Sequence, residues 1–347
     1  MRKCTYTRRE KLIQSKLKDN ESEEILKKLE DNKIGIGISK AHFGEYLQGY
    51  FEDIGGSVND RASISIPLAY SLIDNHLNPK ITEEYYTIPI ASSGSIAIFD
   101  PSENSKLVVD PTDKVKSKLA VQKTLKLLDK ENYGGYLKII TGGKVSQGLG
   151  TSTSDIVSSI RAVANFFHAN LNNDCIAKIA VDTEEASDGI MYDYANLFIT
   201  TKGKILDNYG VLYPKIEILG FKSDQKINGI DTLSIPSRQY THEEKKKLHS
   251  LRFQAGNAFE KGDIKSIGRI ATSSAQINQR FLEKPHLEEI IDLANRYGAD
   301  GVIVAHSGTM MGLMFNPYRM PPTKNLSKIL DTLESLGFSG FKRYLSE

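Results

Sequence analysis

Glycine and hydroxyl residues are concentrated near the middle of this 347-residue chain, over residues 142–155. A strand-like run, 136–140, precedes this segment, and a helix-like run, 156–167, follows it. Glycines let the backbone take positive φ angles and approach a ligand closely. The hydroxyl residues lie where a helix would expose unpaired N–H groups, which favour a bound anion, most often phosphate. The segment therefore predicts a nucleotide-phosphate loop, although an ordinary strand–turn–helix connection with a good N-cap has the same pattern.

This loop differs from the two commonest phosphate-binding motifs. A Walker A loop ends in Gly-Lys-Ser/Thr, whereas Lys144 precedes Gly148 and Gly150 here. A dinucleotide-binding fingerprint reads G-x-G-x-x-G, and Ser154 stands at the position of its third glycine. The loop must therefore be identified by other features of the chain.

Carboxylates are clustered in a second segment, which follows a predicted helix over 174–181. The four acids are Asp182, Glu184, Glu185 and Asp188. Such a cluster is usually a solvated helix end, but apolar residues at 179–181 and 190–191 favour partial burial. Buried carboxylates need a partner, and a metal ion suits several of them together.

A third segment, residues 39–49, is rich in hydrogen-bonding groups yet follows a strand-like alternation over 34–38. It contains an imidazole (His42), an acid (Glu45) and an amide (Gln48). We interpret it as a second part of a site. A hairpin corner with Gly49 in the turn is the simpler alternative.

Composition limits the classes of function. Hydrophobic residues make up 39% and charged residues 25%, as in ordinary globular proteins. The net charge of +2 provides no strong field for nucleic acid or an anionic membrane, so neither is expected as a partner. No apolar run approaches the ~20 residues of a membrane helix. The two cysteines, Cys4 and Cys175, form neither a metal-ligand spacing nor a disulfide framework, which predicts a cytoplasmic location.

The elements around these segments alternate between strands and helices. Strands are predicted over 62–68, 85–90, 95–99, 196–200, 215–221 and 338–345, with a strand–turn–strand unit over 298–315. Helices are predicted over 113–130, 242–261, 263–283, 287–297 and 326–336. Residues 1–33 are highly charged, and Asn20 with Glu23 predicts one amphipathic helix there. That extension is either a docking helix, for example in a homodimer, or a solvated tail.

Three of these segments, in this order, resemble the GHMP superfamily of small-molecule kinases, named for galactokinase, homoserine kinase, mevalonate kinase and phosphomevalonate kinase. Residues 148–153, Gly-Leu-Gly-Thr-Ser-Thr, resemble its phosphate loop, and 41–45 and 298–312 resemble its first and C-terminal motifs. Within the superfamily, segments 44–49, 152–156, 185–188 and 305–309 are most similar to L-threonine kinases of cobalamin synthesis. Lys144 and Thr151 depart from the usual proline and serine of the phosphate motif.

The resemblance implies an α+β fold of two parts. After the charged extension (1–33), an N-terminal half like the ribosomal S5 domain-2 fold (34–200) would bind ATP. A ferredoxin-like C-terminal half (201–347) would carry the last glycine-rich motif. ATP and substrate would meet between the two halves.

The resemblance also implies roles for individual residues. The ATP phosphates would be bound by the loop residues Ser146, Gln147, Gly148, Leu149, Gly150, Thr151, Ser152 and Thr153. Ser152 and Glu185 would bind Mg²⁺, with Glu184 as the alternative because the adjacent glutamates leave the register open. Asp188, which would share a helix face with Glu185, would be the catalytic base or orient the substrate hydroxyl, unless it only caps the next segment. Substrate contacts would come from His42, Glu45, Gln48, His306, Ser307 and Thr309, although His306 is equally a candidate core histidine.

The sequence thus predicts a kinase that uses ATP and Mg²⁺ to phosphorylate a hydroxyl of a small polar metabolite. L-Threonine or a related hydroxy amino acid is the first expectation. A sugar or another small alcohol is the alternative acceptor, because kinship of fold does not settle a substrate. A catalytically silent sensor that binds nucleotide and metabolite is the alternative from a different class.

Overall fold

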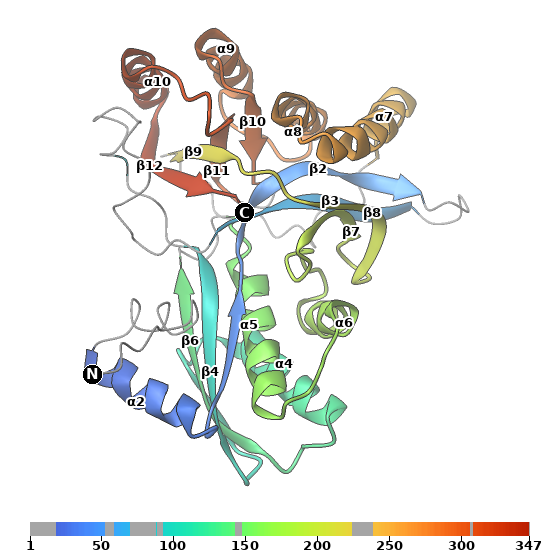
Figure 1. Ribbon diagram of the computed structural model, residues 1–347. Coiled ribbons are helices and arrows are strands. Elements are labelled where there is room, and N and C mark those ends of the chain that lie inside the picture. The colour runs from blue at the N-terminus through green and yellow to red at the C-terminus, as the bar shows by residue number, and fades with distance from the viewer. Residues whose placement is uncertain are drawn as a thin grey trace.

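The protein is built on two β-sheets, and its α+β class agrees with the sequence expectation (Figure 1). The computed structural model describes residues 19–52, 59–69, 88, 93–142, 148–223, 239–305 and 308–346. The predicted strand over 85–90 therefore lies almost wholly outside the described residues, as does the chain before residue 19. Among the described residues, no helix has the length and apolar character needed to cross a lipid bilayer.

The smaller sheet has four strands. Their order is β1 (Gly35–Ser39), β4 (Gly94–Ser102), β6 (Gly134–Gly142) and β5 (Leu107–Asp110), with β5 parallel to β6 and the other pairs antiparallel. Helices α5 (Thr151–Phe166) and α4 (Val115–Leu127) pack on one of its faces. Isoleucine and glycine alternate over 34–38, and the glycines face α5, which allows the helix to approach β1 closely. An added Cβ at Gly35 or Gly37 would lie about 2 Å from a carbonyl oxygen of α5.

The opposite face of the smaller sheet is covered by α2 (Asp19–Glu30), the helix predicted in the charged extension. Leu26 is buried, and the isoleucines of β1 and β4 pack with Ile25 and Leu29. Lys28 donates a hydrogen bond to Asp100 of β4 at 2.9 Å. This helix therefore docks on its own chain, whereas the predicted homodimer stays a prediction.

The larger sheet has eight strands and runs through both predicted halves of the chain. Its order is β12 (Phe338–Leu345), β9 (Glu217–Ser223), β11 (Met310–Phe315), β10 (Gly301–Val304), β2 (His42–Glu52), β3 (Asn59–Pro67), β7 (Tyr194–Ile199) and β8 (Lys204–Leu212). Strands far apart in the sequence, from the two predicted halves, pair where Val304 of β10 lies beside Glu45 of β2. The predicted boundary at residue 200 falls in the turn between the paired strands β7 and β8.

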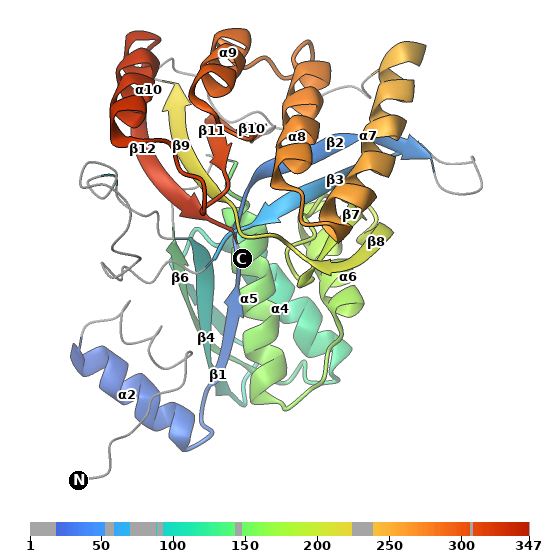
Figure 2. The same cartoon turned by 45° about the horizontal axis from the view of Figure 1, so that its top comes forward.

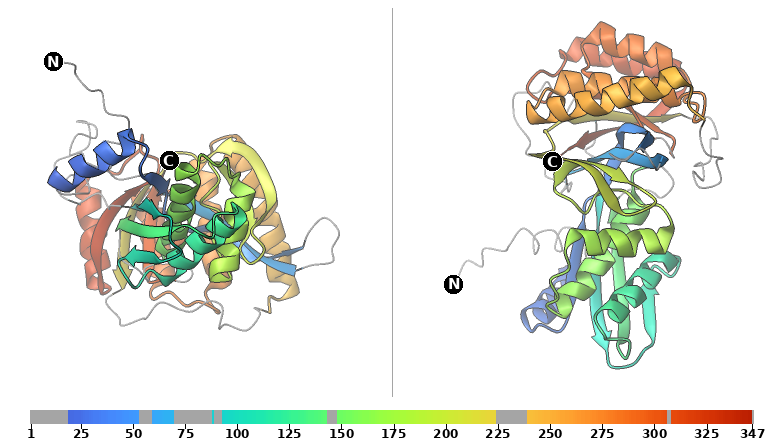
Figure 3. Two further views of the ribbon diagram at one scale, coloured as in Figure 1. Left: turned by 90° about the horizontal axis from the view of Figure 1, so that it is seen from below. Right: turned by 90° about the vertical axis from the view of Figure 1, so that its right-hand side faces the viewer.

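Helices cover one face of this sheet. They are α7 (His242–Glu260), α8 (Ile264–Asn278), α9 (Leu287–Tyr297) and α10 (Thr323–Ser335) (Figure 2). The smaller sheet and its helices lie on the other side (Figure 3, right). Helix α8 ends at Asn278, earlier than the predicted residue 283, and the side chain of Asn278 donates to the carbonyl oxygens of Gln48 and Ser274. The chain then turns.

Three strands differ from the sequence expectation. Gly49 is not in a hairpin corner, because β2 continues through it as far as Glu52. An added Cβ at Gly49 would lie 2.9 Å from Leu248 of α7, so this glycine allows the helix to approach the strand. Strands β5 and β8 were not predicted. Of these two edge strands, β8 (Lys204–Leu212) has no fully buried residue, and such a strand carries a weak hydrophobic pattern.

Candidate active site

The predicted phosphate loop leads into the N-terminus of α5, which points toward the larger sheet (Figures 1 and 2). Gly148 and Gly150 both have positive φ angles, 78° and 59°. Within the described residues, no side chain caps the first turn of α5. A helix N-terminus that lacks a side-chain cap presents N–H groups and a positive dipole end to a ligand, which suits an anion. The predicted loop residues Ser146 and Gln147 lie outside the described residues.

The side chains of the described loop residues have different surroundings. Leu149 is buried in the main core, so only its backbone is available to a ligand. Thr151 and Thr153 are buried as well, whereas Ser152 is partly exposed on the first turn of α5. Gly148 packs against Gly308 of the C-terminal glycine-rich motif, where an added Cβ would lie 2.9 Å from the Gly308 Cα. The fold thus brings the phosphate loop and the C-terminal motif together.

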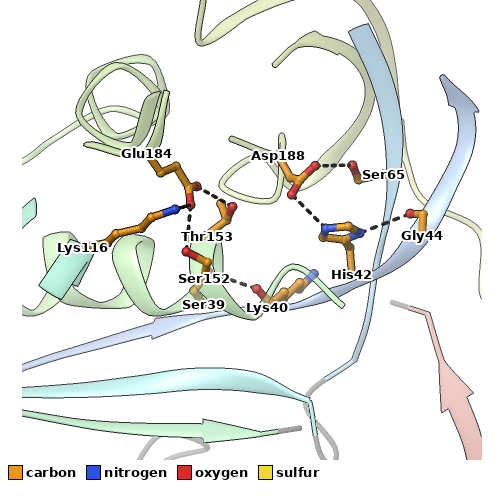
Figure 4. A network of polar contacts seen from close by, with 10 residues as sticks. All are labelled: Ser39, Lys40, His42, Gly44, Ser65, Lys116, Ser152, Thr153, Glu184 and Asp188. Atoms are coloured by element: carbon orange, nitrogen blue, oxygen red, sulfur yellow. Dashed lines mark hydrogen bonds and ion pairs between the residues drawn. The ribbon is translucent and has the colours of Figure 1, made fainter. Parts of the chain in front are cut away.

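Glu184 is the carboxylate beside the phosphate loop (Figure 4). Ser152 Oγ donates to Glu184 Oε2 at 2.9 Å, and Thr153 Oγ1 donates to Glu184 Oε1 at 2.6 Å. Lys116 of α4 places its ammonium 3.8 Å from Glu184 Oε2. Burial raises the pKa of Glu184 and outweighs the opposing hydrogen bonds from the two hydroxyls. A buried carboxylate that shares a serine hydroxyl is an oxygen donor set of the kind that Mg²⁺ prefers.

Glu185, which the sequence favoured as the metal ligand, lies at the exposed end of α6 (Asn173–Glu184), and Ser152 bonds Glu184 instead. Helix α6 ends one residue earlier, and Glu185 takes a left-handed φ of 68° as its C-cap. Its backbone N–H donates to Val181 O, and its side chain is exposed. Asp188 therefore does not share a helix face with Glu185, because α6 ends before both residues.

Asp188 forms a second polar centre with His42, on the other side of Ser152 in Figure 4. His42 Nε2 lies 2.9 Å from Asp188 Oδ2, and Ser65 Oγ donates to Asp188 Oδ1 at 3.4 Å. The other ring nitrogen of His42, Nδ1, lies 3.2 Å from the carbonyl oxygen of Gly44. His42 is buried, with 2% of its surface exposed, whereas about a quarter of the Asp188 side chain is open.

The pair stabilises its own charges. Burial alone would raise the pKa of Asp188, but the His42 ring, together with Arg61 and the Ser65 hydroxyl, outweighs it and holds that pKa below its ordinary value. Burial alone would lower the pKa of His42, but the Asp188 carboxylate, together with Glu45 and the Gly44 carbonyl, outweighs it and raises that pKa to about 9. Asp188 is also close enough to Glu184 to raise its pKa further. At neutral pH the centre therefore holds an ionised carboxylate beside an imidazolium.

Glu45 and Lys284 extend this centre toward the C-terminal half. Glu45 is buried, and its carboxylate lies within 4.8 Å of ligand atoms of both His42 and Asp188. Lys284 Nζ, also buried, donates to the carbonyl oxygen of Gly308 at 2.5 Å. Burial lowers the pKa of Lys284 to about 8, although Glu45 opposes that shift.

The remaining predicted site residues are Gln48, Thr309, His306 and Ser307. Gln48 lies further along β2, where its backbone N–H and carbonyl bond Ser274 and Asn278 of α8. Thr309 is half-buried in the turn before β11. His306 and Ser307 lie outside the described residues.

Three residues of the centre were not predicted: Ser65, Lys116 and Lys284. Ser65 alternates with isoleucines in 62–66, and this period marks a polar strand face that could have been identified. Lys116 and Lys284 give no such signal, because isolated lysines are common in any sequence.

Comparisons with known proteins identify two domains in the chain. Residues 118–203 match the family "GHMP kinases N terminal domain", and residues 257–321 match "GHMP kinases C terminal". An L-threonine kinase from Citrobacter freundii is 25% identical over 175 residues, a span of 50% of this chain and 60% of that protein. A homoserine kinase from Streptococcus equi subsp. equi is 25% identical over 207 residues, or 59% of this chain and 70% of that protein.

The fold is similar to that of solved small-molecule kinases. The crystal structure of a homoserine kinase from Cytophaga hutchinsonii superposes with a TM-score of 0.61 at 13% identity, covering 91% of this chain and 95% of that one. Both domains occur in order along the chain. The chain therefore contains the N- and C-terminal domains of GHMP kinases, within a fold similar to that of a solved homoserine kinase.

Proposed function

We propose that the protein is a kinase that transfers the γ-phosphoryl group of ATP, with Mg²⁺, to a hydroxyl of a small polar metabolite. One observation carries this proposal. The ionised Asp188 and the Glu184–Ser152 pair lie on two sides of the first turn of α5, where no side chain caps the helix within the described residues. A phosphoryl transfer needs an anion site, a metal site and a group that handles the acceptor hydroxyl, in that proximity.

The donor groups fit the nucleotide and the metal. Backbone N–H groups at the start of α5 would hold the phosphates, and the exposed part of Ser152 would face them. Ser152 Oγ and the Glu184 carboxylate would bind the cation. Bound Mg²⁺·ATP supplies the phosphoryl group and a positive charge that offsets the charge on the phosphates.

Asp188 would act on the acceptor. Its carboxylate, held ionised by His42, accepts the proton of the substrate hydroxyl as the O–P bond to the acceptor forms, or it orients that hydroxyl. Glu45, buried at the same centre, would contact a polar group of the substrate.

We infer that the acceptor is L-threonine or a related hydroxy amino acid such as homoserine. The support is the similarity to an L-threonine kinase and to a homoserine kinase, at about 25% identity in both cases. We further propose a cytoplasmic setting, supported by a content of two cysteines in 347 residues.

A coupled ADP-release assay tests the function. Purified protein with Mg²⁺·ATP is offered L-threonine, L-serine, homoserine, amino alcohols and sugars. We expect turnover with a hydroxy amino acid, abolished by Ser152→Ala and strongly reduced by Asp188→Asn. Asp188→Asn should retain ADP binding in calorimetry. A preference for sugars would refute the inference that the acceptor is a hydroxy amino acid. ADP binding without turnover of any acceptor, unchanged by Asp188→Asn, would favour a nucleotide sensor.

A further inference from the structure

His42 was expected to contact substrate, but its surroundings leave its ring no free nitrogen for that purpose. Nε2 faces Asp188 Oδ2 at 2.9 Å, and Nδ1 faces the Gly44 carbonyl oxygen at 3.2 Å. Both partners are acceptors. A neutral imidazole carries one N–H and could satisfy only one of them, whereas an imidazolium donates to both. The geometry alone therefore favours the charged ring.

His42 also lies directly against the phosphate loop. Its backbone N–H donates to Leu149 O at 3.2 Å. Gly150, the last loop residue before α5, has no side chain where the ring lies, and an added Cβ there would be 2.0 Å from His42 Cδ2. One residue thus contacts the loop that would hold ATP and the carboxylate that would act on the acceptor.

We propose that His42 is a positioning residue: its imidazolium fixes the Asp188 carboxylate relative to the phosphate loop and does not itself bind substrate. This inference rests on the proposed function. It adds that the site for the ATP phosphates and the carboxylate that acts on the acceptor are held at a fixed position relative to each other. Ser65 holds the second oxygen of Asp188, so the carboxylate is restrained from two strands, β2 and β3. A carboxylate held by its neighbours needs less reorganisation when the acceptor arrives.

Other charged groups act on the His42–Asp188 pair. Glu45 from β2 reinforces the charge on His42, and Arg61 from β3 helps to keep Asp188 ionised. Glu184 from α6 interacts with Asp188 as a like charge. Among these contacts, the direct ion pair between His42 and Asp188 at 2.9 Å both keeps Asp188 ionised and orients its carboxylate.

A double-mutant cycle tests the proposal. We expect His42→Gln to lower kcat at least 30-fold while the calorimetric affinity for ADP changes less than 3-fold. In an Asp188→Asn background the same substitution should change kcat less than 3-fold, because its effect passes through Asp188. His249→Gln is the matched control, since His249 is exposed on α7. Equal losses in both backgrounds, or a raised KM for the acceptor with unchanged kcat, would overturn the proposal.

A second measurement does not depend on turnover. In ¹⁵N spectra of the histidine rings, His42 should show two protonated nitrogens at pH 7.5, and Asp188→Asn should convert it to a neutral ring. A neutral ring in the unsubstituted protein would refute the ion pair even if the kinase activity is confirmed. If no acceptor is found, the protonation state of His42 still decides whether the ion pair with Asp188 exists. A failure of the proposed function can therefore be told apart from a failure of the proposed role of His42. Tight Zn²⁺ or Mn²⁺ binding lost in His42→Gln and Glu45→Gln would instead assign His42, Glu45 and Asp188 to a metal site.

Discussion

Glu184→Gln tests which of the adjacent glutamates serves the metal. The amide has the shape of the carboxylate and retains one acceptor oxygen, but it lacks the charge. Glu184 accepts hydrogen bonds at 2.9 Å and 2.6 Å from Ser152 and Thr153, and hydrogen bonds to charged groups contribute about 1.5–3 kcal/mol each. Because hydroxyls can also accept from an amide, we expect the ligand-free protein to lose only about 1–2 kcal/mol of stability.

The expected loss of activity is larger. Removing one preorganised electrostatic contact to a transition state costs about 10²–10³-fold in kcat, or about 2.7–4 kcal/mol. Glu184→Gln should therefore reduce kcat by that factor and raise the Mg²⁺ concentration needed for half-maximal rate. The control is Glu185→Gln, one residue away and exposed, which should stay within about 2-fold of the unsubstituted protein by the usual behaviour of surface positions.

The assay is coupled ADP release over a range of Mg²⁺ concentrations, with thermal unfolding of each ligand-free variant measured in parallel. The unfolding curves separate a misfolded Glu184→Gln from a folded variant that is inactive. A folded Glu184→Gln with rates within 3-fold of normal would refute the assignment. A large loss in Glu185→Gln would show that the helix end rearranges when nucleotide binds.

Three further predictions concern stability. Gly150→Ala should destabilise far more than Gly210→Ala, because both glycines have positive φ but only Gly150 has a neighbour, His42, in the way; equal melting temperatures would contradict the packing of the ring on the loop. The free energy of unfolding should fall between about pH 6.5 and 9, by up to about 1.4 kcal/mol per pH unit, because the folded state keeps the His42 proton that the unfolded chain releases. Urea unfolding of His42→Gln should lack that fall. Leu26→Ala should cost about 2–5 kcal/mol in urea unfolding yet leave ADP affinity unchanged, because α2 covers the face of the smaller sheet opposite α5.

Much of the fold follows from local pattern. The strand alternation over 34–38 and the apolar periodicity of the helices α5, α7 and α9 fix those elements within a few residues. The pairing of β10 with β2, which brings together strands from the two predicted halves, could not be read in the same way. It connects residues 259 positions apart, and no local period encodes such a contact.

The sequence allowed the segments of the candidate site to be predicted, but not which side chains of those segments contact each other. The sequence indicated the segments that contain His42, Ser152 and Asp188, and the structure brings all three segments together. The choice between Glu184 and Glu185 depended on where α6 ends. In the segment 184–189 the left-handed C-cap is taken by Glu185, a residue type with no preference for that conformation. Successive residues of a helix point about 100° apart, so an uncertainty of one residue decides which carboxylate reaches Ser152.

The arrangement of charges explains why these segments have to meet. Asp188 and Glu184 are like charges near one another, and each would be driven toward its neutral form if it were left without a partner. Their partners come from different places: His42 from the larger sheet, and the two hydroxyls from the first turn of α5. Asp188 thus stays ionised, whereas Glu184 has a raised pKa that a cation would lower. The ligand-free protein therefore already separates the carboxylate that would act on the acceptor from the one that would take up a metal.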